Sequence, residues 1–86
     1  MRHATAAALD QIDALLQQIR EVDGLVEKKR GIWYRKSKAF LHFHEDPAGI
    51  FADVKLDGDF ERFPANSQRE KRELVRRIRQ ELGRTS

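Results

Sequence analysis

Near the amino terminus, apolar residues recur at intervals of three and four positions, which is the spacing of one face of an α-helix. They are Ala8, Leu9, Ile12, Leu15, Leu16, Ile19 and Val22. The pattern predicts a helix over residues 5–23 with this face buried. Gly24 follows the segment and suits the left-handed conformation in which many helices end.

From Gly31 onwards the period of the apolar positions shortens to two, which is typical of half-buried strands. We expect a sheet region over residues 31–63, with strands at 32–35, 38–45 and 50–56 and a short fourth strand at 60–63. Turn residues separate the strands, namely Lys36-Ser37, the proline- and glycine-containing run 46–49, and Asp57-Gly58. The connector 26–30 is expected to lead into the first strand.

A two-residue turn at Lys36-Ser37 sets the register of the first hairpin, with Tyr34 opposite Ala39 and Trp33 opposite Phe40. Because side chains alternate between the two sides of a strand, this register predicts two faces for the sheet. The predicted core face carries Ile32, Tyr34, Ala39, Leu41, Phe43, Ile50, Ala52, Val54 and Leu56. The predicted open face carries Trp33, Arg35, Lys38, Phe40, His42, His44, Phe51, Asp53 and Lys55.

A second helix is predicted over residues 67–82. Ser67 and Glu70 form a capping-box pattern at its start, and Gly83 stands where the helix is expected to stop. Its buried stripe is predicted to consist of Leu74, Val75, Ile78 and Leu82. The elements follow in the order α-β-β-β-(β)-α, so we expect a two-layer α+β fold, an antiparallel sheet with both helices packed on one face.

The composition is consistent with one small domain over residues 1–86. Charged residues make up 36% of the chain, well above the usual quarter, so a thin core under a charged surface is expected. The absence of cysteine excludes disulfides and thiolate chemistry. No apolar run is long enough for a membrane span or a signal peptide, and we therefore expect a cytoplasmic protein.

The net charge of +3 is unevenly distributed. Residues 1–30 are neutral, residues 31–63 carry −1, and residues 64–86 carry +4. The excess positive charge belongs to the second helix, whose candidate phosphate-contacting residues are Arg72, Arg76, Arg77 and Arg79.

The stretch from the end of the first helix to the fourth strand resembles a known group of small α+β proteins. It contains a basic turn, an aromatic in Lys38-Ala39-Phe40, and the run Val54-Lys55-Leu56 at the end of a later strand. In these features residues 23–63 resemble the YjbR/MmcQ group and the related TfoX N-terminal domains. The resemblance implies the same α+β fold and favours DNA binding, which is proposed for part of the group, and it implies no catalytic residue.

The predicted open face brings His42 and His44 to the same side of one strand, and its register places His42 opposite Asp53. Two histidines and a carboxylate suit a divalent metal ion or an acid–base pair. The alternative is an ordinary cross-strand arrangement of surface residues. The chain contains no G-x-S-x-G motif and no glycine-rich phosphate loop. We therefore expect neither an enzyme nor a resident metal or other cofactor.

The exposed aromatic residues of the predicted open face suggest two binding functions. The first is a small interaction protein that associates with itself or with a protein partner through Trp33, Phe40, His42 and Phe51. The alternative is a nucleic-acid-binding protein in which aromatics stack on bases while Arg35, Lys38 and the arginines of the second helix contact phosphates. The candidate partner-binding residues are those of the whole predicted open face, including His44, Asp53 and Lys55.

Overall fold

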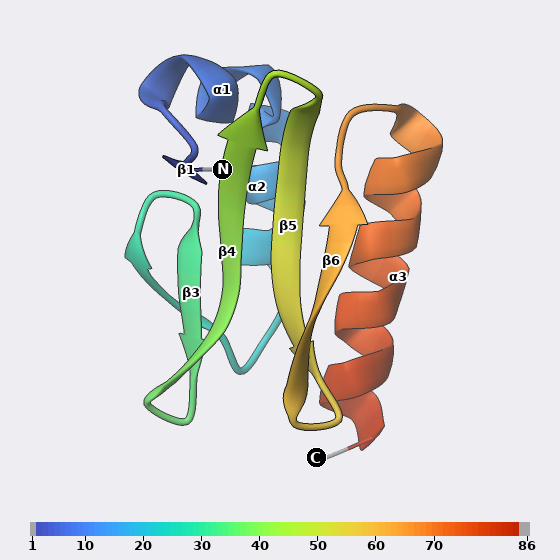
Figure 1. Cartoon of the computed structure of the whole chain (residues 1–86). Helices are drawn as coiled ribbons and strands as arrows, with labels where there is room; N and C mark the ends of the chain where they lie inside the picture. Colours follow the sequence, from blue (N-terminus) through green and yellow to red (C-terminus); the bar gives the residue numbers. More distant parts are fainter. Residues whose placement is uncertain (1, 85–86) are drawn as a thin grey trace.

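In a computed structural model, which describes residues 2–84, the chain forms an α+β domain around one antiparallel sheet (Figure 1). The helices are α1 (Ala6–Gln11), α2 (Asp13–Arg20) and α3 (Gln68–Arg84). The strands are β1 (Arg2–His3), β2 (Val26–Lys29), β3 (Ile32–Arg35), β4 (Lys38–Asp46), β5 (Gly49–Leu56) and β6 (Asp59–Pro64). The predicted α+β class and the antiparallel sheet are confirmed.

The sheet has the order β2-β3-β4-β5-β6, and β1 pairs with β4 beyond the end of β3. It is wider than predicted because residues 26–29 form a strand of their own rather than a lead-in to β3. In Figure 1, α2 lies behind the sheet and α3 runs alongside β6. Residues from α1, α2, α3 and the strands contribute to one buried hydrophobic cluster.

The helical pattern at the amino terminus predicted the buried residues correctly, since all seven of its apolar positions are in the core. The continuous helix is wrong, however, because the chain turns at Ile12, which has φ −114° and ψ 24°. The pairing of β1 with β4 fixes the start of the segment, and the backbone amide of Ala4 donates to the carbonyl of Phe43. A bend at Ile12 allows both short helices to bury apolar residues from this fixed start.

The second helix begins as predicted but ends later. The Ser67 hydroxyl accepts from the Glu70 amide at 3.0 Å, and the Glu70 carboxylate accepts from the Ser67 amide at 3.0 Å, so the capping box is formed. The predicted stop at Gly83 is wrong, because α3 extends to Arg84. Arg84 pairs with Asp57 in the β5–β6 turn at 3.5 Å, and this contact ties the last helical turn to the sheet.

The β4–β5 hairpin has the predicted register, with Leu41 opposite Val54 and Phe43 opposite Ala52. The β3–β4 hairpin departs from it one step beyond the turn. Tyr34 lies opposite Ala39 as predicted, but Trp33 lies opposite Leu41 instead of Phe40. One additional residue of β4, Phe40, is thus accommodated in a β-bulge.

Because of the bulge, the side chains of β3 and of the first residues of β4 lie on the side of the sheet opposite to the predicted one. Part of the predicted open face is therefore wrong. Trp33 and Phe40 are core residues, only 1% and 3% exposed. Arg35 and Lys38, which are paired with each other next to the turn, also lie on the core side of the strands by alternation. The predicted core residues that instead lie on the open side are Ile32, Tyr34 and Ala39.

The burial of Trp33 is directly measurable because it is the single tryptophan of the chain. We expect blue-shifted emission that acrylamide quenches poorly, since the indole is enclosed by the core and touches Phe43 edge-on at 6.1 Å between ring centroids. Trp33→Ala should cost about 3–5 kcal/mol of unfolding free energy. The control is Trp33→Phe combined with Phe60→Trp, which moves the probe to a site that is 48% exposed. Equal quenching of the two proteins would contradict the bulged register.

Candidate functional site

The face of the sheet that is in front in Figure 1 has no helix across it. We call it the outer face and define it by cross-strand partners, because directly opposed residues project to the same side. One row across the sheet consists of Ile32, His42, Asp53 and Arg62. The other members are His3, Val26, Lys29, Tyr34, Ala39, His44, Asp46, Gly49, Phe51, Lys55, Phe60 and Pro64.

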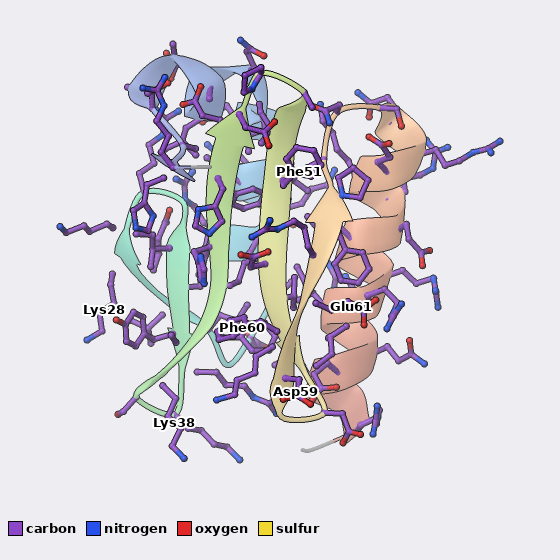
Figure 2. The ribbon with its side chains drawn as sticks, in the orientation of Figure 1. Lys28, Lys38, Phe51, Asp59, Phe60 and Glu61 are labelled. Carbon is purple, nitrogen blue, oxygen red and sulfur yellow. The ribbon has the colours of Figure 1, made fainter. Side chains whose placement is uncertain are left out.

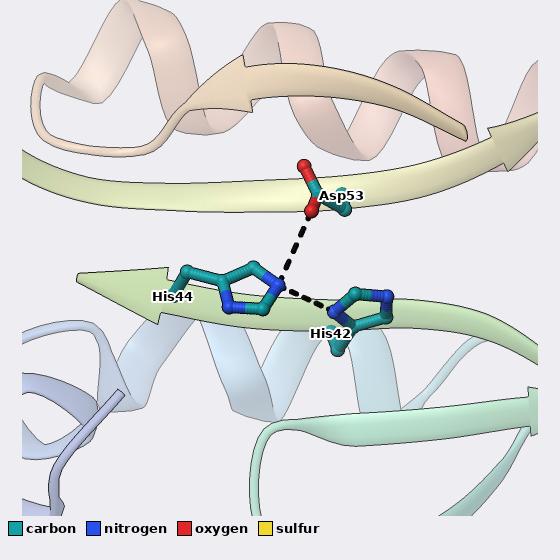
Figure 3. Close-up of side chains that lie close together, drawn as sticks. All are labelled: His42, His44 and Asp53. Atoms are coloured by element: carbon teal, nitrogen blue, oxygen red, sulfur yellow. Dashed lines mark hydrogen bonds and ion pairs between the residues drawn. The ribbon is translucent and has the colours of Figure 1, made fainter. Parts of the chain in front are cut away.

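At the centre of the outer face, His42, His44 and Asp53 converge (Figure 3). The Nδ1 atom of His42 is 2.6 Å from Nε2 of His44, and the same Nε2 is 3.2 Å from Oδ2 of Asp53. The two histidines are two residues apart on β4 and the carboxylate comes from the neighbouring strand β5. We call these three residues the His–His–Asp cluster.

Arg62 on β6 holds the carboxylate of the cluster from the other side. Its Nε and Nη2 atoms donate to Oδ1 and Oδ2 of Asp53 at 2.8 and 3.0 Å, a two-pronged ion pair. This pairing with Arg62 holds the pKa of Asp53 below its usual value, although the residue is only 8% exposed. A buried carboxylate therefore stays charged in the middle of the sheet.

The short contact between the histidines restricts where their protons lie. A single proton between Nδ1 of His42 and Nε2 of His44 makes a hydrogen bond, whereas a proton on both nitrogens brings two donors together. Burial, followed by repulsion from His44, lowers the pKa of His42. The cluster thus contains at least one neutral imidazole with a nitrogen lone pair directed inward.

Aromatic rings surround the cluster. His3, from β1, stacks over His44 with ring centroids 5.3 Å apart, and Phe60, from β6, contacts His42 edge-on at 5.2 Å. His3 and Phe60 were not among the predicted site residues. The sequence offered no signal for His3, because a two-residue strand has no recognisable period. Phe60 was assigned to the fourth strand without a register.

The lower half of the outer face combines rings with lysines. Nζ of Lys28 is 5.6 Å from the centroid of the Tyr34 ring, and Nζ of Lys55 is 5.9 Å from that of Phe60. Figure 2 labels Lys28 and Phe60 on this side of the molecule. We call these four residues the basic–aromatic patch. Neither lysine forms an ion pair within residues 2–84.

The structure divides the predicted site residues into two groups. His42, His44, Phe51, Asp53 and Lys55 lie on the outer face as predicted. The remaining four, Trp33, Arg35, Lys38 and Phe40, do not, because of the bulge.

The arginines of α3 differ in how available they are. Arg76 is paired with Glu73 at 2.7 Å, and Arg77 lies over the ring of Phe63 and 3.6 Å from Glu61. Arg72 and Arg79 are exposed and have no carboxylate partner in the described part of the chain. Two of the four candidate phosphate contacts are therefore already occupied.

The His44–Asp53 pair has the arrangement in which a carboxylate orients an imidazole for acid–base work. No serine or threonine side chain among residues 2–84 is hydrogen bonded to either histidine, although Thr5 accepts a bond at the start of α1. The three side chains of the cluster also bring nitrogen and oxygen lone pairs together, which is the arrangement that holds a ligand.

Comparisons with protein-family models, with curated proteins and with solved structures found no match for this chain. The resemblance to the YjbR/MmcQ group stays a prediction. No helix within residues 2–84 has both the length and the apolar character needed to cross a membrane.

The ion pair between Asp53 and Arg62 predicts how the stability of the protein depends on pH. Because the folded-state pKa of Asp53 is depressed, its contribution to stability is complete above about pH 4, the unfolded value, and is lost as the pH falls through the folded value. Arg62→Gln should raise the pKa of Asp53 in a carboxyl NMR titration and reduce the loss of stability between neutral and acid pH. Arg76→Gln, which breaks the pair with Glu73 on α3, is the matched control. An unchanged Asp53 titration in Arg62→Gln would show that the arginine does not set this pKa.

Proposed function

We propose that this chain is a non-catalytic binding protein, and that the basic–aromatic patch of its outer face binds single-stranded nucleic acid. The observation that carries the proposal is the pairing of each ring with a lysine on a sheet face that no helix crosses. Aromatic rings stack on bases of any identity, and cations beside them hold the phosphates.

The electrostatics of the outer face support an anionic partner. Asp53 is the carboxylate in the central row, and Arg62 neutralises it in a two-pronged ion pair. Lys28 and Lys55 form no ion pair within residues 2–84 and are therefore available to a partner. Phe60 is 48% exposed and Val26 is 58% exposed, and both of these large exposed apolar side chains belong to the outer face.

Self-association through the same face is the weaker alternative. The self-association hypothesis depended on exposed aromatic residues, and two of them, Trp33 and Phe40, are buried in the core. A symmetric dimer places the same patch on both subunits, so lysines of the two copies are brought towards one another. The like charges oppose such a contact, whereas a phosphate backbone complements them.

The test is fluorescence anisotropy with labelled single-stranded oligonucleotides of ~12 nucleotides. If Lys28 and Lys55 each contact one phosphate, the logarithm of the affinity should fall against the logarithm of salt with a slope of about −1.4, or about sevenfold between 50 and 200 mM. Lys55→Gln should flatten the slope by about 0.7. Phe60→Ala should weaken binding at least about fivefold, since a lost stack costs about 1–3 kcal/mol.

Variants on α3 provide the controls. Arg79→Gln removes an exposed positive charge from α3, outside the basic–aromatic patch. It should leave the affinity nearly unchanged. No binding at the lower salt concentration, or a loss confined to Arg72→Gln and Arg79→Gln, would overturn the assignment to the outer face. Sedimentation velocity on the same samples detects a dimer. A dimer that Phe60→Ala dissociates, without oligonucleotide binding, would establish the self-association alternative in its place.

A further inference from the structure

We infer that the His–His–Asp cluster is a binding site for a divalent transition-metal ion such as Zn²⁺ or Ni²⁺. The ligands are Nδ1 of His42, Nε2 of His44 and Oδ2 of Asp53. This inference is independent of nucleic-acid binding, since none of the three residues belongs to the basic–aromatic patch.

The convergence of donor atoms is the first argument. The three potential ligand atoms all lie within 4.8 Å of one another. Tetrahedral zinc at bond lengths of 2.0–2.1 Å requires donor atoms about 3.3 Å apart. The His44–Asp53 distance of 3.2 Å already satisfies this spacing. The two histidine nitrogens, 2.6 Å apart, must separate by about 0.7 Å before both can bind the ion.

The identity of the donors selects the class of metal. Two imidazole nitrogens with one carboxylate oxygen suit zinc, nickel, cobalt and copper, whereas magnesium and calcium prefer oxygen ligands alone. Three protein ligands also leave one tetrahedral position for water or an exogenous ligand.

The protein holds the donors in place before a metal binds. His42 and His44 project from β4 to the same side of the sheet. The pairing of β4 with β5 fixes their neighbours, since His42 lies directly opposite Asp53 and His44 lies directly opposite Phe51. The side chains of His44 and Asp53 are only 14% and 12% exposed, so few rotamers are available to them. A site built on adjacent hydrogen-bonded strands is more precise than one on loops.

The 2.6 Å contact between Nδ1 of His42 and Nε2 of His44 requires a proton on one of these two nitrogens, and both nitrogens are assigned here as metal ligands. For both nitrogens to act as ligands, that proton must move to the other nitrogen of its ring or leave to solvent. The contact between His42 and His44 is therefore the metal-free form of the same arrangement. Acid should release the metal, because protonated imidazole has no lone pair.

Arg62 sets the affinity. Its Nη2 atom donates to the same Oδ2 atom that we assign as a ligand, and its positive charge repels a cation. The side chain is 51% exposed, so it is free to move aside while Nε retains Oδ1. Removing the arginine should therefore strengthen metal binding, although it weakens the metal-free network. A purely structural ion pair does not predict this increase.

The experiment is isothermal titration calorimetry of tag-free protein with Zn²⁺ and Ni²⁺, together with the visible absorption of the Co²⁺ complex. We expect one ion per chain, shifts confined to the His42 and His44 imidazole resonances and their neighbours, and no response to Mg²⁺. His42→Gln, His44→Gln and Asp53→Asn should each weaken binding at least about tenfold. Arg62→Gln should tighten it several-fold.

His3→Gln is the matched control, because it removes an imidazole that stacks on His44 without belonging to the ligand set. Its affinity should equal that of the wild type. The site is wrong if saturating Zn²⁺ and Ni²⁺ leave the two imidazole resonances unchanged, or if His3→Gln abolishes binding while His42→Gln does not. Circular dichroism of each variant identifies misfolding, and Asp53→Asn, which preserves side-chain shape, keeps the test valid if a histidine variant does not fold.

Discussion

The structure depends on one irregularity, the bulge at which Phe40 and Leu41 of β4 both lie opposite Trp33. An additional residue in one strand brings two consecutive side chains to the same side, so both enter the core beside the indole. Beyond this point the alternation of β4 continues undisturbed, which leaves His42 and His44 on the outer face. The bulge therefore determines both which large rings fill the core and which polar residues remain available for ligands.

The outer face combines two surfaces with different chemistry. The His–His–Asp cluster at its centre is largely buried and self-satisfied, and no buried side-chain nitrogen or oxygen in residues 2–84 lacks a hydrogen-bond partner. The basic–aromatic patch is open, with a half-exposed ring and two lysines that form no ion pair within the described residues. Phe60 connects the two, because its ring contacts His42 while Lys55 lies over it. A ligand on either surface thus meets side chains that adjoin the other.

Charge pairing explains why the basic surplus of the carboxyl-terminal segment does not make α3 the main candidate surface. Arg76 lies near Glu73 and Arg77 lies near Glu61, so the positive charge of both arginines is partly neutralised within the fold. Lys28 on β2, which belongs to a segment of zero net charge, pairs with no carboxylate in the part of the chain that the structure describes. Regional net charge is therefore a poor guide to the availability of individual cations, because pairing is set by which side chains the fold brings within reach.

The sequence by itself determined the α+β class, the buried face of the amino-terminal segment, the capping box at Ser67 and the β4–β5 register that places His42 opposite Asp53. These features follow from local periodicity, local hydrogen bonding and the length of a turn, all of which are legible along the chain. Tertiary structure alone decided the bulge, the bend at Ile12 and the β1 strand that brings His3 to His44. Each of these depends on packing between segments distant in sequence. The bulge forms because burying the indole stabilises the fold by more than the interrupted pairing between the strands costs. This comparison depends on the packed core, so the local sequence pattern does not reveal it.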